Sequence, residues 1–248
     1  MRLIIVGANG KLGKLVLAQA ARDSSIEIVG QVSRSFNNTA PFFNSINNIN
    51  SACDCILDVS HPDNLSEILA YAQNHHTPLV IATTGFNVSQ VEQINTAARQ
   101  IPILLTSNTS LGVFSFRQLV AKATKLLNNW DIEIVETHHN QKADAPSGTA
   151  KTIIEDIRQV RELNPISNRT GKRQPNEIGI VALRGGTVPG THTVNFFGDN
   201  ETITLTHQAQ SRVIFAQGAI ECCTIMENQK ENKLFRMEDI LKLGGEQC

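Results

Sequence analysis

The fold is decided by residues 2–22, RLIIVGANGKLGKLVLAQAAR, in which an apolar run, a glycine-rich turn and a helical pattern follow one another. Leu3 to Val6 form the apolar run, and Gly7, Gly10 and Gly13 give the spacing G-x-x-G-x-x-G. Such glycines allow a tight turn, close approach of the backbone to a pyrophosphate, and close packing of the helix on the strand. The spacing alone is a weak signal, but its position between a strand and a helix favours a nucleotide-binding turn over an ordinary one.

Short apolar strands alternate with helices through the first part of the chain. Apolar runs predict the strands, and amphipathic spacing predicts the helices between them. After the first strand, strands are predicted at residues 26–32, 53–60, 78–85 and 101–108, and helices at residues 61–76 and 88–99. This alternation predicts an α/β domain built on a Rossmann-like, doubly wound parallel sheet, with ligands at the carboxyl ends of the strands.

The pattern changes near Ser110, where we place the boundary between two domains. A long amphipathic helix, residues 111–129, leads into the alternating strand DIEIVETHH, residues 131–139. Residues 178–208 then read as strands joined by glycine turns, without helices between them. Strands in direct succession predict a smaller α+β domain with a mixed sheet.

Residues 136–150, ETHHNQKADAPSGTA, combine two histidines, a lysine and an exposed helix start. His138 and His139 lie at the end of the strand and are expected to point to opposite faces unless the chain turns there, because successive side chains of a strand alternate. Their imidazoles and the ammonium of Lys142 can supply positive charge and a transferable proton. A single histidine at a strand end is more often structural, so it is the combination that favours a functional site.

The helix after these histidines is predicted to have Pro146 in its first turn, where the missing N–H of proline would have had no partner. Ser147, Gly148 and Thr149 then offer unpaired backbone amides, and the helix dipole favours an anion beside them. Gly148 has no side chain to keep the anion away. Together with the lysine and the histidines, these amides predict a site for a small dianion that is protonated during the reaction.

The pattern E-x-H-H-x-x-K-x-D-A-P-S-G-T-A resembles the signature of the dihydrodipicolinate reductase family, and the likeness extends from Gly7 to the MEDIL tail. The resemblance implies NAD(P)H-dependent reduction of a small dicarboxylate, 4-hydroxy-tetrahydrodipicolinate (dihydrodipicolinate), to tetrahydrodipicolinate in the diaminopimelate route of lysine biosynthesis. It also implies a homotetramer with a dinucleotide-binding domain of residues 1–109 and 217–248. Residues 110–216 would then form the substrate-binding and oligomerisation domain.

The resemblance also assigns roles to individual residues. His138 matches the acid/base residue and Lys142 the proton donor, while substrate contacts are implied for His139, Ser147, Gly148 and Thr149. Cofactor contacts are implied for Gly7, Ala8, Asn9, Gly10, Lys11, Leu12, Ser33, Arg34, Ala82, Thr83, Thr84, Thr106, Ser107, Asn108 and Thr109. Ala82 stands where the family usually has the glycine of a GTTG motif, and backbone contacts from the two following threonines could survive that change.

The cofactor preference rests on Ser33 and Arg34, which follow the predicted second strand. A site for NADH normally presents an acidic residue here to the ribose hydroxyls. A hydroxyl and a cation suit a 2′-phosphate instead, so NADPH is expected in preference to NADH. The alternative is that Arg34 is a solvated loop residue. Relatives often carry an acidic residue nearby, so NADH remains the second candidate.

Composition and charge exclude several classes of protein. The chain has 248 residues and 41% hydrophobic content, enough for the cores of one large or two modest domains. A formal net charge of −1 leaves no basic surface typical of nucleic-acid binding. No apolar run approaches the roughly 20 residues that span a bilayer, and the N-terminus flows into the glycine turn. We therefore expect a soluble, cytoplasmic protein that binds neither nucleic acid nor membranes.

The cysteines indicate no metal site and no disulfide framework. There are five of them, an odd number without a C-x-x-C pair: Cys53, Cys55, Cys222, Cys223 and Cys248. Reduced and mostly buried thiols are therefore expected, and no metal is predicted anywhere in the chain.

Two other functions remain possible from the sequence. One is another two-domain NAD(P)-dependent reductase or amino-acid dehydrogenase, although such chemistry would not need the HHNQK and DAPSGT segments in this order. The other is a non-catalytic regulator that binds NADP. Retention of His138, His139 and Lys142 argues against a regulator, because sensing a nucleotide does not require them.

Overall fold

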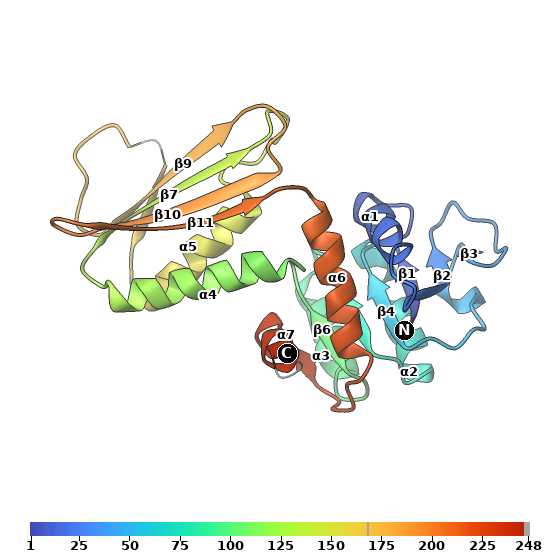
Figure 1. Cartoon of the computed structure of the whole chain (residues 1–248). Helices are drawn as coiled ribbons and strands as arrows, with labels where there is room; N and C mark the ends of the chain where they lie inside the picture. The colour runs from blue at the N-terminus through green and yellow to red at the C-terminus, as the bar shows by residue number, and fades with distance from the viewer. Residues whose placement is uncertain (168, 246–248) are drawn as a thin grey trace. The chain divides into compact units, whose positions relative to one another are not determined.

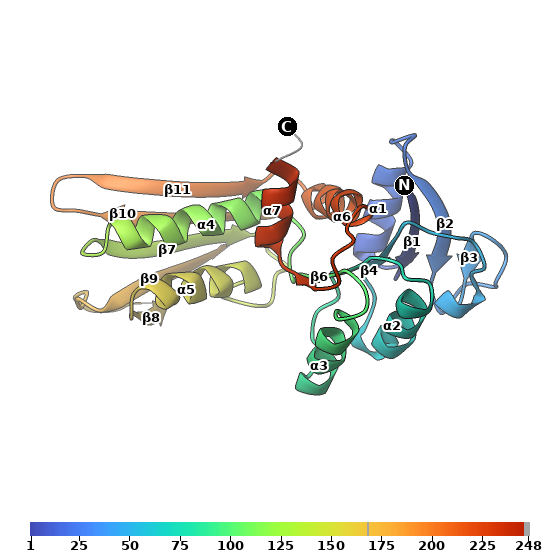
Figure 2. The ribbon, with the colours of Figure 1, turned by 90° about the horizontal axis from the view of Figure 1, so that it is seen from below.

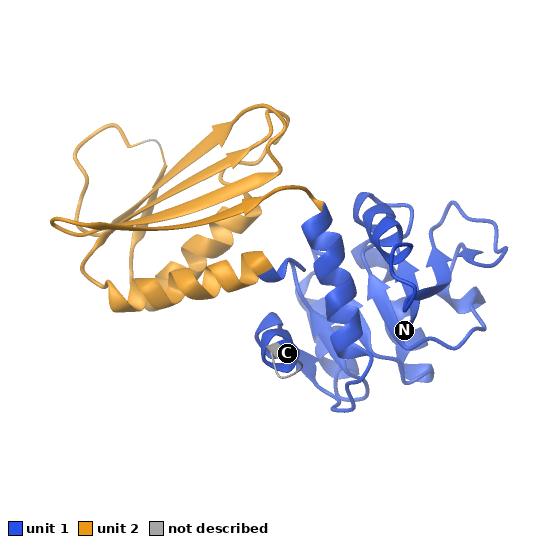
Figure 3. Cartoon of the chain, viewed as in Figure 1, with its two compact units in different colours: residues 1–111, 213–248 blue, residues 112–212 orange. Residues whose placement is uncertain are grey.

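The computed structural model describes residues 1–167 and 169–245, and the chain divides into two compact units (Figures 1 and 3). Unit 1 comprises residues 1–111 and 213–248, and unit 2 comprises residues 112–212. The sequence places these boundaries at residues 109/110 and 216/217. The structure places the first boundary two residues later and the second four residues earlier, because helix α6 (Val213–Met226) is unbroken and belongs to unit 1 over its whole length.

Unit 1 is built on a seven-stranded sheet in the order β12-β6-β5-β4-β1-β2-β3, in which all neighbours are parallel. Its strands are β1 (Arg2–Val6), β2 (Glu27–Val32), β3 (Phe42–Phe43), β4 (Cys55–Asp58), β5 (Leu79–Ile81), β6 (Ile103–Leu105) and β12 (Leu234–Phe235). The central strands are buried, as in β1, where Leu3, Ile4 and Ile5 are fully inaccessible. Strands covered on both faces need continuous apolar runs, which is why the sequence pattern revealed them.

Helices cover both faces of this sheet, which confirms the predicted doubly wound domain (Figure 2). Helices α1 (Lys11–Ala20) and α6 pack together on one face, and α2 (Leu65–Asn74) and α3 (Val88–Ala97) pack together on the other. The remaining elements are the short helices η1 (Ile46–Asn48) and η2 (Pro62–Asn64) and helix α7 (Met237–Gly245). No helix in residues 1–167 and 169–245 is both long and apolar enough to cross a membrane.

The last part of the chain is held in unit 1 by a close contact between α6 and the loop after β6. A side chain at Gly218 would collide with the carbonyl of Thr109, so glycine allows the helix and the loop to touch. The hydroxyl of Thr109 donates a hydrogen bond of 2.6 Å to the carbonyl of Phe215. These contacts join residues that are more than a hundred positions apart in the sequence.

Unit 2 is a five-stranded mixed sheet with two helices, which confirms the predicted α+β domain. The order is β11-β10-β7-β9-β8, where β7 and β8 are parallel to β9, and β10 is antiparallel to β7 and β11. The elements are α4 (Leu111–Leu126), β7 (Asp131–His138), α5 (Gly148–Val160), β8 (Asn164–Ser167), β9 (Glu177–Arg184), β10 (Gly190–Phe197) and β11 (Thr202–Ala209). Both helices lie on one face of the sheet (Figure 1).

Strand β7 carries the functional stretch out of an apolar core. Ile132 and Ile134 pack against residues of α4 and α5, and their neighbours along the strand are more exposed. The same alternation places Glu136 and His138 on this covered face. The strand therefore ends with two polar side chains that extend the apolar stripe.

Candidate active site

The site in unit 2 begins with Glu136 and His138 at the end of β7. Glu136 is fully buried, His138 is 8% exposed, and Oε2 of the glutamate contacts Nδ1 of the imidazole. His139 follows the end of the strand and is less buried than His138. The Nε2 atom of His139 accepts a hydrogen bond of 3.0 Å from Nη2 of Arg212.

The second carboxylate oxygen of Glu136 holds two further parts of the site. Its Oε1 accepts hydrogen bonds from the backbone N–H of Ser147, at 3.1 Å, and from Nη2 of Arg184, at 2.8 Å. Burial alone would raise the pKa of the Glu136 carboxyl, but these donors and the nearby His138 lower it below its ordinary value. Glu136 is therefore an ionised carboxylate that only accepts hydrogen bonds.

The electrostatic environment keeps His138 neutral near pH 7. Burial lowers the pKa of His138 below its ordinary value, while the Glu136 carboxylate acts in the opposite direction. The positive charges of Lys142 and Arg184 lower the pKa further. The Nζ atom of Lys142 forms an ion pair with Oδ1 of Asp144, at 2.7 Å. Lys142 is thus close enough for its charge to act on His138, and the resemblance to the family implies proton transfer for both residues.

The start of α5 differs from the sequence prediction. The helix begins at Gly148, and Ser147 is its N-cap, because the Ser147 hydroxyl accepts a hydrogen bond of 3.2 Å from the N–H of Ala150. The placement of Pro146 in the first turn was wrong, since it precedes the capping residue. Gly148 is exposed, and a Cβ atom there would meet nothing within 4 Å. Because no side chain at Gly148 blocks the approach, the backbone N–H groups of Gly148 and Thr149 in the first turn are open to an anion.

Sequence reasoning missed His192, which lies on β10 directly opposite Glu136. Its Nε2 is 3.1 Å from the hydroxyl of Ser147, and its ring lies edge-on to that of His138 with 5.2 Å between centroids. Burial, with a smaller contribution from His138, lowers the pKa of His192 to about 4. The segment around His192 has no local signal for a site, because the register of β10 against β7 creates the contact.

The buried, neutral His192 predicts a pH-dependent stability. The unfolded state binds a proton on this imidazole below about pH 6.5, whereas the folded state does so only below about pH 4, so acidification favours unfolding. We expect His192 to reduce the free energy of unfolding by about 3 kcal/mol as the pH falls across this window. Urea unfolding of the wild type and of His192→Asn at several pH values measures the difference. Equal pH dependence in the two proteins would contradict the prediction.

Glu136, His138 and His192 are also close enough to hold a metal ion, because one donor atom from each lies within 4.8 Å of the others. Arg184 already pairs with the same carboxylate, and its positive charge opposes a cation there. The absence of a metal remains a prediction from the sequence.

Unit 1 contains the predicted nucleotide-binding turn between β1 and α1. Gly7 has a φ of +89°, and a Cβ atom there would lie 2.5 Å from the carbonyl oxygen of Val59. Gly10 is the N-cap of α1 and supplies no side-chain hydrogen bond to it. Lys11 and Leu12 open the helix, so its first amides are available to a phosphate.

The two residues between these glycines have different surroundings. Ala8 is buried, and its N–H donates a hydrogen bond of 3.1 Å to the carbonyl of Val32. Asn9 is exposed, and its Nδ2 donates a hydrogen bond of 3.2 Å to the hydroxyl of Ser35. Asn9 therefore links the glycine turn to the loop that follows β2.

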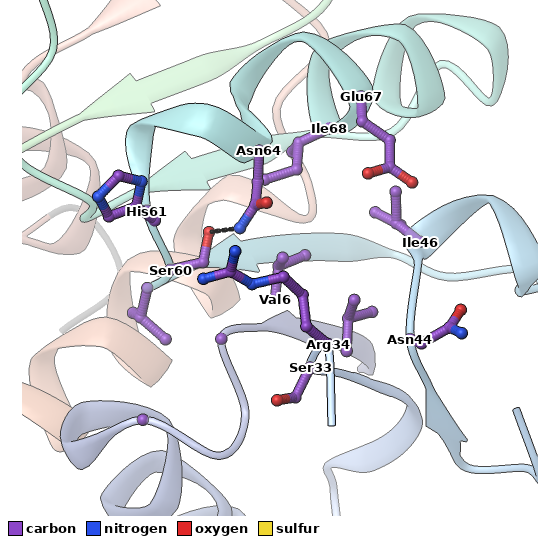
Figure 4. Close-up of a pocket in the computed structure, with 14 residues that line it drawn as sticks. Val6, Ser33, Arg34, Asn44, Ile46, Ser60, His61, Asn64, Glu67 and Ile68 are labelled. Atoms are coloured by element: carbon purple, nitrogen blue, oxygen red, sulfur yellow. Dashed lines mark hydrogen bonds between the residues drawn. The ribbon is translucent and has the colours of Figure 1, made fainter. Parts of the chain in front are cut away.

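A cavity of about 210 Å³ joins the glycine turn to the end of β2. Ser33 and Arg34 line it, and the Arg34 side chain extends into it in Figure 4. The cavity is also lined by residues to which the sequence assigned no role: Asn44, Ile46, His61, Asn64, Glu67 and Ile68. Asn44 and Ile46 come from residues 36–51, an asparagine-rich segment that is brought beside β2 by the pairing of β3.

Of the segments after β5 and β6, only the one after β5 lines a cavity described here. Ala82, Thr83 and Thr84 line a second cavity of about 500 Å³ together with Leu12. The residues Thr106, Ser107, Asn108 and Thr109 line neither this cavity nor the one beside Arg34. The Thr106 hydroxyl donates to the carbonyl of Asn108 and the Thr109 hydroxyl to that of Phe215, so both hydroxyls are engaged within the protein.

Comparisons with known proteins agree with this architecture. The curated 4-hydroxy-tetrahydrodipicolinate reductase of Caldanaerobacter subterraneus subsp. tengcongensis is 41% identical over 250 residues, covering 98% of this chain and 99% of its own. That of Rickettsia bellii is 40% identical over 237 residues, covering 95% and 92% of the two chains. A solved structure described as dipicolinate-bound dihydrodipicolinate reductase from Paenisporosarcina sp. TG-14 has the same fold. Its TM-score is 0.80 at 22% identity, covering 95% of this chain and 97% of that one.

Two family profiles together match almost the whole chain. Residues 1–109 match the profile described as dihydrodipicolinate reductase, N-terminus, and residues 112–241 match the one described as dihydrodipicolinate reductase, C-terminus. With the folds of both units and the identity to the curated relatives, these matches show that the chain belongs to the dihydrodipicolinate reductase family.

Proposed function

We propose that this protein reduces 4-hydroxy-tetrahydrodipicolinate to tetrahydrodipicolinate with a nicotinamide nucleotide, in the diaminopimelate route of lysine biosynthesis. The observation that carries the proposal is the arrangement of His138, Glu136 and Lys142 beside the open start of α5. The names of the curated relatives and the dipicolinate-bound relative support a cyclic dicarboxylate as the substrate.

The dicarboxylate is held by the start of α5 and by nearby cations. The amides of Gly148 and Thr149, with the Thr149 hydroxyl, bind one carboxylate, because the first turn of a helix favours negative charge. His139 and Lys142 contact the substrate from the segment between β7 and α5. The buried Ser147 shapes this pocket by capping the helix rather than by exposing its own hydroxyl.

The protein supplies the proton that accompanies the hydride. The bound cofactor provides a hydride, that is, one hydrogen with its electron pair. Lys142 donates a proton to the carbon that becomes electron-rich, and His138 acts as acid/base at its Nε2 atom. General acid assistance of this kind typically accelerates a reaction by about 10²- to 10⁴-fold.

The cofactor binds along unit 1, whose glycine turn fits a pyrophosphate. The backbone of Gly7 to Leu12 would hold the pyrophosphate, and Ser33 and Arg34, which line the adjoining cavity, would contact the adenosine ribose. Ala82 to Thr84 line the second cavity and would hold the nicotinamide side of the cofactor. Thr106 to Thr109 follow β6 and would contact that side through their backbone, because the hydroxyls of Thr106 and Thr109 are engaged within the protein. Since no acidic residue stands at positions 33 and 34, NADPH is preferred to NADH.

Replacing Arg34 by alanine tests the cofactor preference. A charge-assisted hydrogen bond contributes about 1.5–3 kcal/mol, so we expect the KM for NADPH to rise roughly 10- to 100-fold. The KM for NADH should change less than about threefold, because NADH lacks the 2′-phosphate that the guanidinium would bind. Arg99→Ala, at an exposed position in the same unit, is the control. Equal effects on both cofactors would refute recognition of the phosphate by Arg34.

A coupled assay tests the function itself. The freshly generated product of dihydrodipicolinate synthase is mixed with this protein, and oxidation of NADPH or NADH is followed by absorbance. Oxidation that depends on the synthase product supports the proposal. Folded protein that binds NADPH but gives no oxidation would refute it, and would favour the dehydrogenase or the non-catalytic regulator.

Self-association and location complete the proposal. The open face of the unit 2 sheet exposes Val181, Leu183 and Phe197, each at least 41% accessible. Exposed apolar side chains on a sheet favour association between copies, so a homotetramer is proposed, and analytical ultracentrifugation tests it.

A cytoplasmic location is proposed as well. The four described cysteines are free thiols, as is typical of cytoplasmic proteins, and Cys248 lies outside the described residues.

A further inference from the structure

Glu136 is the one carboxylate through which the separate parts of the unit 2 site are connected. Its Oε2 contacts Nδ1 of His138, and its Oε1 accepts a hydrogen bond from the N–H of Ser147 at the start of α5. The same Oε1 accepts a hydrogen bond from Nη2 of Arg184. This Nη2 also donates a hydrogen bond of 2.7 Å to the backbone carbonyl of Asp144. Asp144 in turn pairs with Lys142. Three segments of the site thus depend on this side chain.

We propose that Glu136 is the positioning residue of the active site, which keeps a proton on Nδ1 of His138 so that Nε2 exchanges protons with the substrate. The inference rests on the proposed function, because it assigns Glu136 a role through His138. Through Ser147 and Arg184, the same carboxylate also sets the positions of the α5 start and of the segment that carries Lys142.

The hydrogen-bond pattern around Glu136 determines the tautomer of His138. A buried charge is costly unless it is paired, and three donors surround this carboxylate. An ionised carboxylate can only accept, so Nδ1 of His138 must carry the hydrogen in this contact. The lone pair of the neutral imidazole then lies on Nε2. When Nε2 takes up a proton, the carboxylate stabilises the imidazolium that forms.

Space is available at Nε2 because the facing residue is Gly190, the first residue of β10. A Cβ atom on Gly190 would lie only 3.0 Å from Nε2 of His138. A side chain there would crowd the atom that exchanges the proton. The glycine and the glutamate therefore act on opposite sides of the same ring.

The substitution Glu136→Gln separates the charge and the tautomer from the shape. The amide oxygen replaces Oε1, where Ser147 and Arg184 both donate, so the NH₂ group faces His138. An NH₂ group donates, so Nδ1 becomes the acceptor and the hydrogen moves to Nε2. Ring-nitrogen shifts in ¹H–¹⁵N NMR distinguish the two tautomers, and signals lost in His138→Asn identify this histidine.

Kinetics provide the second readout. We expect Glu136→Gln to lower kcat at least about 100-fold, as when a histidine is held in the wrong tautomer. The acid limb of its pH–rate profile should move to lower pH, since the carboxylate no longer raises the pKa of His138. Glu136→Asp retains the charge and should restore part of kcat. Glu133→Gln is the matched control, on the opposite face of β7 and paired with Arg169, and should keep both kcat and the pH profile.

The outcomes separate this inference from the proposed function. A wild-type His138 with its hydrogen on Nε2 would overturn the role of Glu136, even if the Gln variant did not fold. A folded Glu136→Gln with normal kcat and an unchanged pH profile would overturn it as well. Wild-type protein that does not turn over the synthase product would refute the proposed function instead, while the NMR tautomer still decides what Glu136 does.

Discussion

Replacing Lys142 by alanine is expected to lower kcat at least about a hundredfold while the protein remains folded. Lys142 is the proposed proton donor, and its ammonium lies on the segment that leads from β7 to α5. Its ion pair is with Asp144, whose side chain is 51% exposed. The Lys142 side chain is 20% exposed, but the Asp144 end of the pair is open to solvent, so its loss should reduce the free energy of unfolding by about 1 kcal/mol and leave the protein folded.

The coupled assay at saturating NADPH measures this effect, and circular dichroism confirms the fold. Lys125→Ala is the matched control, because Lys125 is an exposed lysine in the last turn of α4. It should retain wild-type kcat and thermal stability. Near-normal turnover in Lys142→Ala would exclude Lys142 as the proton donor and leave His138 as the candidate.

The substitution Gly7→Ala is expected to destabilise unit 1 and to abolish tight cofactor binding. Its φ of +89° is unfavourable for any residue with a side chain, at about 1–2 kcal/mol. A Cβ atom would also lie 2.5 Å from the Val59 carbonyl oxygen and 2.8 Å from Cα of Ser60, which are backbone atoms with little freedom to move. Strain and overpacking together should reduce the free energy of unfolding by about 3 kcal/mol.

Urea unfolding and NADPH titration followed by cofactor fluorescence measure the two effects. Gly171→Ala is the control, because a Cβ atom at Gly171 would meet nothing within 4 Å. It should leave both quantities within experimental error of the wild type. Wild-type stability and affinity in Gly7→Ala would show that the turn relaxes without cost, and that the glycine is not required.

Local sequence patterns were sufficient for most of the fold. The strands of unit 1 are apolar runs because both faces are covered, and β7 alternates because one face is covered. The observed strands of unit 1 are shorter than predicted, ending at Asp58, Ile81 and Leu105. The following residues leave the sheet, because they form the loops at the carboxyl ends of the strands. Apolar spacing reports burial and does not show where strand pairing stops.

The candidate site was predictable where its residues are consecutive. His138, His139, Lys142 and the start of α5 fall within residues 138–149, so their proximity follows from the chain itself. The first turn of α5 was misplaced, because the cap depends on a hydrogen bond between Ser147 and Ala150 that proline statistics do not include. The contact of Thr109 with α6 was equally invisible, since it joins distant segments.

By itself, the sequence determined the two domain types, the glycine turn between β1 and α1, and the stretch that carries the proposed proton donors, because each of these depends on neighbouring residues. Only the tertiary structure decided that Glu136 joins the site together, that His192 faces it, and that Arg184 pairs with it. In the sequence pattern, Glu136 is only one of the alternate positions of β7 that face the covered side. Its partners become known only from the pairing of β7 with β9 and β10. A register shift of one residue would turn these partners to the opposite face, so their roles depend on long-range pairing rather than on local pattern.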